Sequence, residues 1–484
     1  MFKPLASTAI AVAIAALMSG CTTLGPDFKA PAAPGDTAFR HAPETIGDSA
    51  RLPAAWWTVF GDATLDSLET RALRDNPNVS AAAQRLLQAQ AQLGVVRAGQ
   101  LPSVSVGAGV SNSRTSAETA QGLALGGRSI EGNNYSVAAS LSYELDLWGR
   151  VRRVVEASDA QALAAQYDRD GVLLMLSNQV ASSYWQLRGL DVEMAILKDA
   201  LATRGESQQL VEARFNAGLS NELDVSRARI ERANAEADLH EVQRQRNLVE
   251  HALATLVGAS PSAPLLGETA SAANAQLPLP PAIPVGLPAS LVGQRPDLAA
   301  SVAQLKAANA QIGVAEGAFY PALTLTGNFG YASKSLNDLA SGGARQFSAG
   351  PLSLSLPVFD GGRNRSNLAL AQARYDEARA NHEARLLTAL REVEDALSDL
   401  EQRAKQGEVQ AQSQQAAARA LLVAQARYER GVSTYLDVTD AQRSTLSADR
   451  AAAQIRTQRL LAAVAVARAL GGGWEQGPAL ATVR

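Results

Sequence analysis

Two short stretches, one in each half of the chain, place acidic side chains just after a glycine that could end a helix. The first stretch holds Gly218, Asp224 and Arg227, and the second holds Gly431, Asp437 and Asp440. A glycine in the left-handed conformation is a common end of a helix. Carboxylates just beyond such a turn can cap the next helix, or they can attract cations.

Capping explains two of these aspartates. Asn221 and Thr434 have the residue types of N-caps, and Asp224 and Asp437 follow three residues later, as in a capping box. A carboxylate at this position also interacts with the helix dipole, by roughly 0.3–1 kcal/mol. Asp440 lies one turn beyond Asp437 on the same helix face and is not needed as a cap.

Residues suited to other chemistry are scarce. We find no nucleophile beside a base, no phosphate-binding loop and no cluster of metal ligands, so we assign no catalytic residue, no metal and no cofactor. One cysteine excludes a disulfide framework, and the glycine runs at 361–363 and 471–473 are better explained as turns. A net charge of −3 gives no indication of nucleic-acid binding. The sequence argues against an enzyme.

The elements that position the two stretches occur twice. A shift of 213 residues, the difference between positions 431 and 218, also superimposes Gly149-Arg150 on Gly362-Arg363. The same shift aligns residues 223–225 with 436–438 without a gap over about 80 residues. This pattern predicts an internal two-fold repeat, and therefore one elongated body rather than several globular domains.

Long helices are expected to carry both turns. No proline occurs in 103–260 or in 358–477, and proline costs about 3 kcal/mol inside a helix. From Leu173 to Leu201 the apolar residues step by three and four, with a break at Ser183, as in a coiled-coil seam.

A single helix over 150–204 would be roughly 80 Å long, far more than the helices of most compact domains. A cytosolic coiled-coil rod would also contain such a helix. We disfavour a rod because candidate strands flank the helices.

Four stretches alternate apolar and polar residues with the period of a strand. They cover 103–111, 136–147, 323–331 and 352–358. Such segments are typical of transmembrane β-barrels, and Trp148 at a strand end suits the aromatic girdle. Four strands cannot close a barrel, so several chains are expected to share one. Pro351 and Pro357 are expected at the ends of the fourth strand.

The first residues have the pattern of a targeting segment. Lys3 precedes a short apolar run that ends at Met18-Ser19-Gly20-Cys21, which resembles a bacterial lipobox. The only cysteine of the chain lies where a lipobox needs it, so Cys21 is the predicted lipidation site. An ordinary signal peptide is the alternative. Since Thr22 follows the cysteine, the resemblance implies that the lipoprotein goes to the outer membrane.

The chain divides into six predicted parts. They are a signal peptide (1–20), a lipidated extended segment (21–62), repeat one (63–259), a connector rich in proline and alanine (260–288), repeat two (289–471) and a tail (472–484). Each repeat is expected to hold a helix, two strands and a long helical hairpin, with helices at 80–101 and through Leu65, Leu68 and Ala72 in repeat one. Trp56 and Trp57 are interpreted as packing anchors.

These features together resemble TolC-type outer-membrane efflux proteins, in the lipoprotein branch that serves resistance–nodulation–division pumps. The resembling stretches are CTTLGPDF at 21–28, WWTVFGDATL at 56–65, YELDLWGR at 143–150, LPASLVGQRPDLAA at 287–300, IGVAEGAFYPALTL at 312–325 and RYERGVSTYLDVTDA at 427–441. The resemblance implies an α+β membrane protein. Three chains would share a twelve-stranded β-barrel in the outer membrane, above a helical barrel in the periplasm.

The resemblance also implies a function. The homotrimer would be the passive exit duct of a tripartite efflux pump, which conducts drugs or other small molecules and contains no catalytic group. Its partners would be a periplasmic adaptor and an inner-membrane pump. A duct for type I protein secretion is the nearest alternative. A lipid-anchored periplasmic adaptor is less favoured, because adaptors lack duplicated pairs of barrel-type strands.

By the same resemblance, the hairpin turns would form a gate at the periplasmic entrance. Copies of Asp437 and Asp440 from three chains would make a ring of carboxylates that favours cations. Tyr428 matches a tyrosine of the family's gate network, although packing at the turn explains it equally well. Arg227 is the repeat-one counterpart of Asp440, so an Arg227–Asp440 bridge could latch the turns. Ser433 stands where some relatives carry a gating arginine, which puts a Ser433 lock in doubt.

Overall fold

The structure is a computed structural model that describes residues 23–32, 38–41, 52–124, 126–262, 264–265, 277–284 and 291–474. The predicted signal peptide and Cys21 lie outside the described residues. Two compact units divide the chain. The first takes its described residues from 1–31, 86–165 and 301–382, and the second takes them from 32–85, 166–300 and 383–484.

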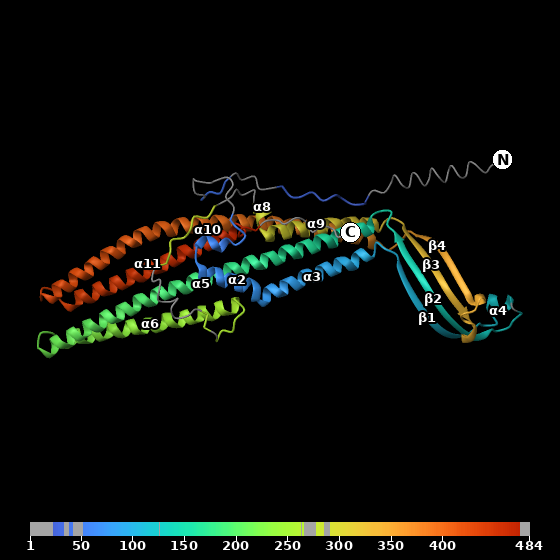
Figure 1. Ribbon diagram of the computed structural model, residues 1–484. Helices are drawn as coiled ribbons and strands as arrows, with labels where there is room; N and C mark the ends of the chain where they lie inside the picture. The colour runs from blue at the N-terminus through green and yellow to red at the C-terminus, as the bar shows by residue number, and fades with distance from the viewer. Residues whose placement is uncertain are drawn as a thin grey trace. The chain divides into compact units, whose positions relative to one another are not determined.

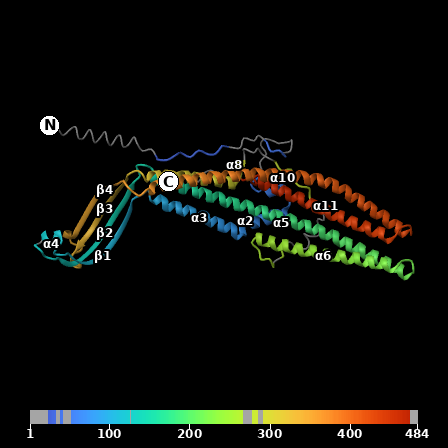
Figure 2. The same cartoon turned by 180° about the vertical axis from the view of Figure 1, so that it is seen from behind.

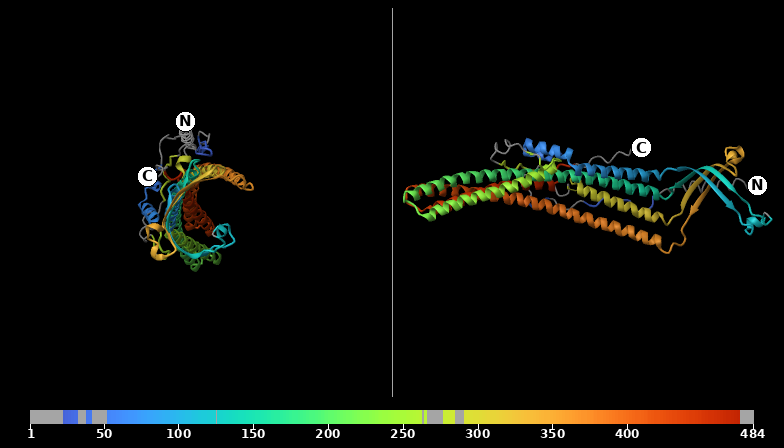
Figure 3. Two further views of the ribbon diagram at one scale, coloured as in Figure 1. Left: turned by 90° about the vertical axis from the view of Figure 1, so that its right-hand side faces the viewer. Right: turned by 90° about the horizontal axis from the view of Figure 1, so that it is seen from below.

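The first unit contains one antiparallel sheet. Its strands are β1 (Ser103–Arg114), β2 (Glu131–Leu145), β3 (Ala322–Ser333) and β4 (Arg345–Ser355), and they lie side by side in this order (Figures 1 and 2). The connections that hold α4 (Ala120–Ala124), η3 (Leu336–Asp338) and η4 (Gly342–Ala344) lie at the same end of the sheet (Figure 3). Two strands thus come from each half of the chain.

The fourth strand differs from the prediction. It begins at Arg345 and ends at Ser355, so Pro351 lies inside it rather than at its end. The pairing shifts there, because Leu325 pairs with Leu352 while Gly327 pairs with Ala349. Proline is tolerated at such a bulge and on an edge strand, and β4 is an edge strand.

The described start of the chain is fixed against the first unit. The Arg153 guanidinium donates to the Leu24 carbonyl over 2.9 Å, and the Leu24 amide donates to the Trp148 carbonyl over 3.1 Å. The Asn309 side chain donates to the Pro26 carbonyl over 2.7 Å. The segment that follows Cys21 is therefore held by hydrogen bonds rather than by apolar packing alone.

Helical pairs of matching length occur in the two halves of the chain. Helices α5 (Arg150–Asn216) and α10 (Arg363–Glu429) each have 67 residues, while α6 (Glu222–Leu256) and α11 (Tyr435–Ala469) each have 35. Helices α3 (Pro77–Ala98) and α9 (Pro296–Gly317) each have 22. The ends of α5 and α6, and those of α10 and α11, lie side by side as hairpins (Figure 3). These are the lengths that an internal repeat predicts.

Two helix boundaries correct the predictions. Helix α5 continues past Arg204 to Asn216, because one glycine inside a helix, Gly205, does not end it. The helix ends just before Gly218, which takes the left-handed conformation. Helix α3 begins at Pro77, since proline is favoured in the first turn of a helix. Among the described helices, none has an apolar stretch long enough to cross a membrane.

The core of the second unit forms where short helices pack on the long ones. Helix η1 (Trp56–Phe60), α2 (Ala63–Asp75) and α8 (Leu291–Gln294) precede the long helices of their halves. Trp56 is 1% exposed and donates its indole N–H to the Ser177 hydroxyl over 3.0 Å, which confirms it as a packing anchor. The predicted seam is also buried at Leu176, Val180, Leu187, Leu190 and Leu197. At the predicted break, the neighbouring Tyr184 fills the core.

Candidate functional site: the hairpin turns

Both hairpins turn at a glycine in the left-handed conformation. Gly218 has a φ of 72° and Gly431 has a φ of 74°. In the first turn the Leu219 amide donates to the Arg214 carbonyl, and in the second the Val432 amide donates to the Arg427 carbonyl. These bonds satisfy carbonyls at the helix ends. Both glycines thus take the predicted conformation.

The next helices begin with caps. The Asn221 side chain accepts a bond of 3.0 Å from the Asp224 amide. Thr434 and Asp437 form a capping box, in which the Asp437 carboxylate accepts from the Thr434 amide over 3.0 Å. The Asp224 carboxylate instead accepts from the Ser220 hydroxyl over 3.2 Å. The capping prediction is therefore confirmed for Asp437.

Arg227 and Asp440 each have a partner on their own helix. Arg227 lies 3.5 Å from the Asp224 carboxylate, and Asp440 lies 3.9 Å from Arg443. Among the described ion pairs of one chain, these two residues are not joined to each other. The Asp440 side chain is 62% exposed, and Asp437 is exposed as well. Both carboxylates are therefore accessible to the surrounding solvent.

Tyr428 is buried against an arginine that the sequence did not single out. The guanidinium carbon of Arg214 lies 4.5 Å from the centre of the Tyr428 ring, and the Tyr435 ring lies 5.5 Å away. Arg214 also donates to the Tyr428 carbonyl over 3.2 Å and to the Glu429 carbonyl over 3.1 Å. Arg214, at the end of α5, thus holds the end of α10. The packing interpretation of Tyr428 fits this geometry.

Burial also acts on Tyr435. Burial raises the pKa of Tyr435 to about 12, and the nearby Tyr428 adds to this effect. The ring packs with Val211, Val225 and Val438 in a small apolar cluster between the ends of the hairpins. The phenol is therefore neutral throughout the physiological range, so Tyr435 contributes packing rather than charge to this part of the site.

An ionic triad behind the turns consists of the buried Arg204 and Glu231 and the exposed Arg443. The Arg204 guanidinium donates to the Glu231 carbonyl over 2.8 Å and lies 3.3 Å from its carboxylate. Arg443 donates to the same carboxylate over 2.7 Å. Burial lowers the pKa of Arg204, and the Glu231 charge opposes this effect. The triad joins α5 and α6 to α11 and thereby ties the hairpins together.

The chemistry of the turns is electrostatic. In the part of the chain that the structure describes, no three His, Cys, Asp or Glu side chains are grouped closely enough to hold a metal ion. Exposed carboxylates beside a helix start can attract cations without binding one tightly. The exposed carboxylates of the turns can therefore interact with ions through charge alone.

Comparison with known proteins identifies a family that matches both halves of the chain. The model of the outer membrane efflux protein family matches residues 68–259 and 287–472. Outer membrane protein OprJ of Pseudomonas aeruginosa is 34% identical over 479 residues, which cover 98% of both chains. The cation efflux system protein CusC of Escherichia coli is 29% identical, over 96% of this chain and 98% of CusC.

A solved structure gives the same result for the fold. The Campylobacter jejuni CmeC outer membrane channel superimposes with a TM-score of 0.87 at 26% identity, over 94% of this chain and 96% of CmeC. The matched family is one of efflux channels and not of enzymes. Because the family model matches most of both halves, the chain belongs to the outer membrane efflux protein family.

Proposed function

We propose that three copies of this chain form the passive exit duct of a tripartite efflux pump. One observation supports the proposal most strongly: the four-stranded sheet has unpaired edges at β1 and β4. Several of its apolar side chains are also more than half exposed, namely Val104, Val106, Val110, Leu352 and Leu354. Open sheet edges do not occur in lipid, so further copies must close the sheet.

The remaining parts of the proposal follow from family membership. Strands from three chains would close a twelve-stranded barrel in the outer membrane, and the chain would be anchored by a lipid on Cys21. A periplasmic adaptor and an inner-membrane pump of the resistance–nodulation–division class would deliver the solute and the energy. The efflux functions in the names of this chain's relatives, such as CusC, favour a pump over a type I secretion system.

The mass of the extracted protein tests the shared barrel. Light scattering in mild detergent, with the detergent contribution subtracted, is expected to give about three times the 50.6 kDa of one chain. A mass near that of one chain, or recovery in the soluble fraction without detergent, would contradict a barrel built from several copies.

We further propose that Asp440 and Asp437 form the cation-selective ring of the periplasmic entrance. Asp437 also serves as a cap, so its removal changes helix stability together with charge. Asp440 has no capping bond and is the cleaner probe. Neutralising it as Asp440→Asn is expected to lower the preference for K⁺ over Cl⁻ about tenfold at low salt, since a cleft of one sign concentrates counter-ions.

Planar-bilayer reversal potentials measure this preference. Asp395→Asn is the matched control, because Asp395 is 75% exposed and also lies 3.9 Å from an arginine on its own helix. The effect of Asp440→Asn should fade at 1 M salt, where the Debye length falls to about 3 Å. Equal selectivity of the Asp440 and Asp395 variants would refute the ring. Unchanged conductance of Arg227→Ala would separately refute an Arg227–Asp440 latch between chains.

A further inference from the structure

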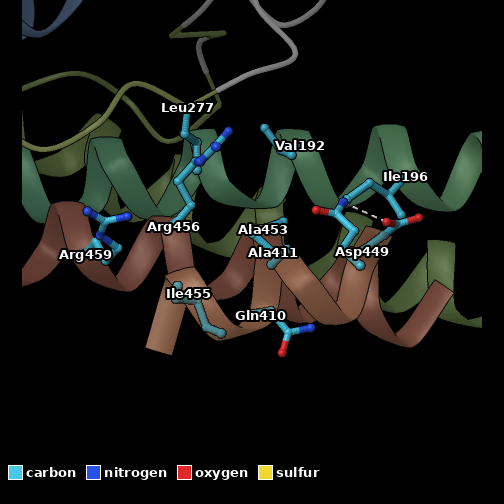
Figure 4. A pocket seen from close by; sticks show the side chains of 13 residues that line it. Val192, Ile196, Leu277, Gln410, Ala411, Asp449, Ala453, Ile455, Arg456 and Arg459 are labelled. Atoms are coloured by element: carbon cyan, nitrogen blue, oxygen red, sulfur yellow. Dashed lines mark hydrogen bonds between the residues drawn. The ribbon is translucent and has the colours of Figure 1, made fainter. Parts of the chain in front are cut away.

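A cavity in the second unit lies between α5, α10 and α11 and is covered by Leu277 (Figure 4). Its volume is about 410 Å³, within the range of small-molecule sites. None of the proposed gate residues Asp437, Asp440 and Tyr428 lines this cavity. It is lined on the α5 side by Val192 and Ile196, while α11 contributes Arg456 and Arg459.

The two arginines give the cavity a positive charge. They are three residues apart on α11 and therefore share one helix face. Within the described residues, neither forms an ion pair or a hydrogen bond, and the buried Nε of Arg459 has no acceptor. The nearby Asp449 already accepts a bond of 2.7 Å from the Gln414 side chain. A buried guanidinium N–H without an acceptor is costly, so an anionic oxygen that accepts from Arg459 would be stabilised here.

One part of the cavity wall is apolar, while Gln410, Gln414 and Asp449 add polar groups elsewhere in the lining. Val192, Ile196 and Leu277 lie across from the arginines, and Figure 4 shows Arg456 reaching toward Leu277. Gly407 opposes Arg459, and its missing side chain leaves the guanidinium room, because an added Cβ would lie 3.3 Å from its terminal nitrogen. A ligand here would combine one negative group with a short apolar body.

We propose that this cavity binds one amphipathic monocarboxylate per chain. The carboxylate would accept hydrogen bonds from Arg459 and Arg456, and the alkyl body would cover Val192, Ile196 and Leu277. Because the ligand would contact α5 of one hairpin and both helices of the other, it would stabilise their packing. The inference is separate from the duct, since one chain provides every lining residue.

Octanoate is a suitable probe for this site. Titration of [1-¹³C]octanoate into the full-length protein in maltoside detergent, followed by NMR, is expected to show saturable binding of one carboxylate per chain. Saturation should also raise the midpoint of thermal unfolding, because the ligand binds the folded state. Acetate, which lacks the apolar body, and 1-octanol, which lacks the charge, should each bind at least about tenfold more weakly.

Variants decide whether the arginines form the site. The double variant Arg456→Gln/Arg459→Gln should weaken octanoate binding about ten- to hundredfold, since it removes charged hydrogen bonds. Arg419→Gln is the matched control: Arg419 is an exposed arginine of α10 outside the cavity, and its replacement should change nothing. Equal binding by the double variant and the control, or absence of saturation in the wild type, would overturn the proposal. Binding of inorganic phosphate as tightly as octanoate would also overturn it.

Discussion

Replacing Glu69 with glutamine will raise the midpoint of thermal unfolding strongly at pH 8 and only slightly at pH 5. Glu69 lies on α2, is 0% exposed, and neither of its carboxylate oxygens has a hydrogen-bond partner among the described residues. Burial raises the pKa of Glu69 from 4.5 to about 9. The charge of Asp66 adds to this effect, and the nearby backbone of Ala181 partly offsets it.

The sign of the pH dependence follows from these values. Between pH 4.5 and about 9, the unfolded chain releases the Glu69 proton and the folded chain retains it. Stability contributed by this group is therefore complete below pH 4.5 and is lost as the pH rises toward 9. The cost to the wild type is roughly 1 kcal/mol at pH 5 and roughly 5 kcal/mol at pH 8, taking 1.36 kcal/mol per pKa unit. Glutamine has no proton to lose and avoids this cost.

Unfolding midpoints from pH 5 to pH 9, followed by tryptophan fluorescence, measure the effect. Glu383→Gln is the matched control, because Glu383 is exposed on α10. That control should follow the wild-type pH profile, whereas Glu69→Gln should diverge from it as the pH rises. Parallel profiles for all three proteins would mean that Glu69 is ionised in the folded state.

Replacing Glu231 with alanine will destabilise the hairpins by about 3–5 kcal/mol, because it leaves the Arg204 charge buried without a counter-ion. The side chains of Arg204 and Glu231 are 6% and 3% exposed. Arg204 also donates to the Glu231 carbonyl, but a neutral carbonyl does not balance its charge. The loss should appear as a lower unfolding midpoint and as faster hydrogen exchange in α6 near the turn.

The same helix provides a matched control. Glu241 pairs with Arg244 over 2.7 Å, but both side chains are at least half exposed. Glu241→Ala should leave the unfolding midpoint almost unchanged, since water screens an exposed pair. A double replacement of Arg204 and Glu231 by leucine should recover much of the loss. Equal effects of Glu231→Ala and Glu241→Ala would contradict a special role for the buried Arg204–Glu231 pair.

Features encoded by neighbouring residues could be predicted from the sequence. The glycine turns and the Thr434–Asp437 cap depend on residues within a few positions, so the spacing alone predicted them. The start of the fourth strand was not predicted, because Gly350 and Pro351 interrupt the alternation of apolar and polar residues. The strand nevertheless continues before them, from Arg345. These two residues lie at a β-bulge, and a bulge has no periodic pattern by which the sequence could reveal it.

Contacts between distant residues could not be predicted. Arg214 bonds carbonyls of residues 428 and 429, and no local pattern links an arginine to the backbone of another hairpin. Glu69 left a weak signal, since it shares the apolar face of α2 with Leu65, Leu68 and Ala72. An acidic residue on such a face indicates a buried carboxyl. The cavity beside Arg459 required the packing of three helices and left no signal.

The matching lengths of the hairpins restrict how this chain can change in evolution. Each residue inserted into α5 alone would advance its end by about 1.5 Å and rotate it by about 100°. Such an insertion would carry Arg214 away from the carbonyls of Tyr428 and Glu429. Insertions and deletions should therefore survive only when the other half of the chain changes by the same number of residues. Within this family, lineages with longer or shorter hairpins are expected to have gained or lost whole turns in both halves together.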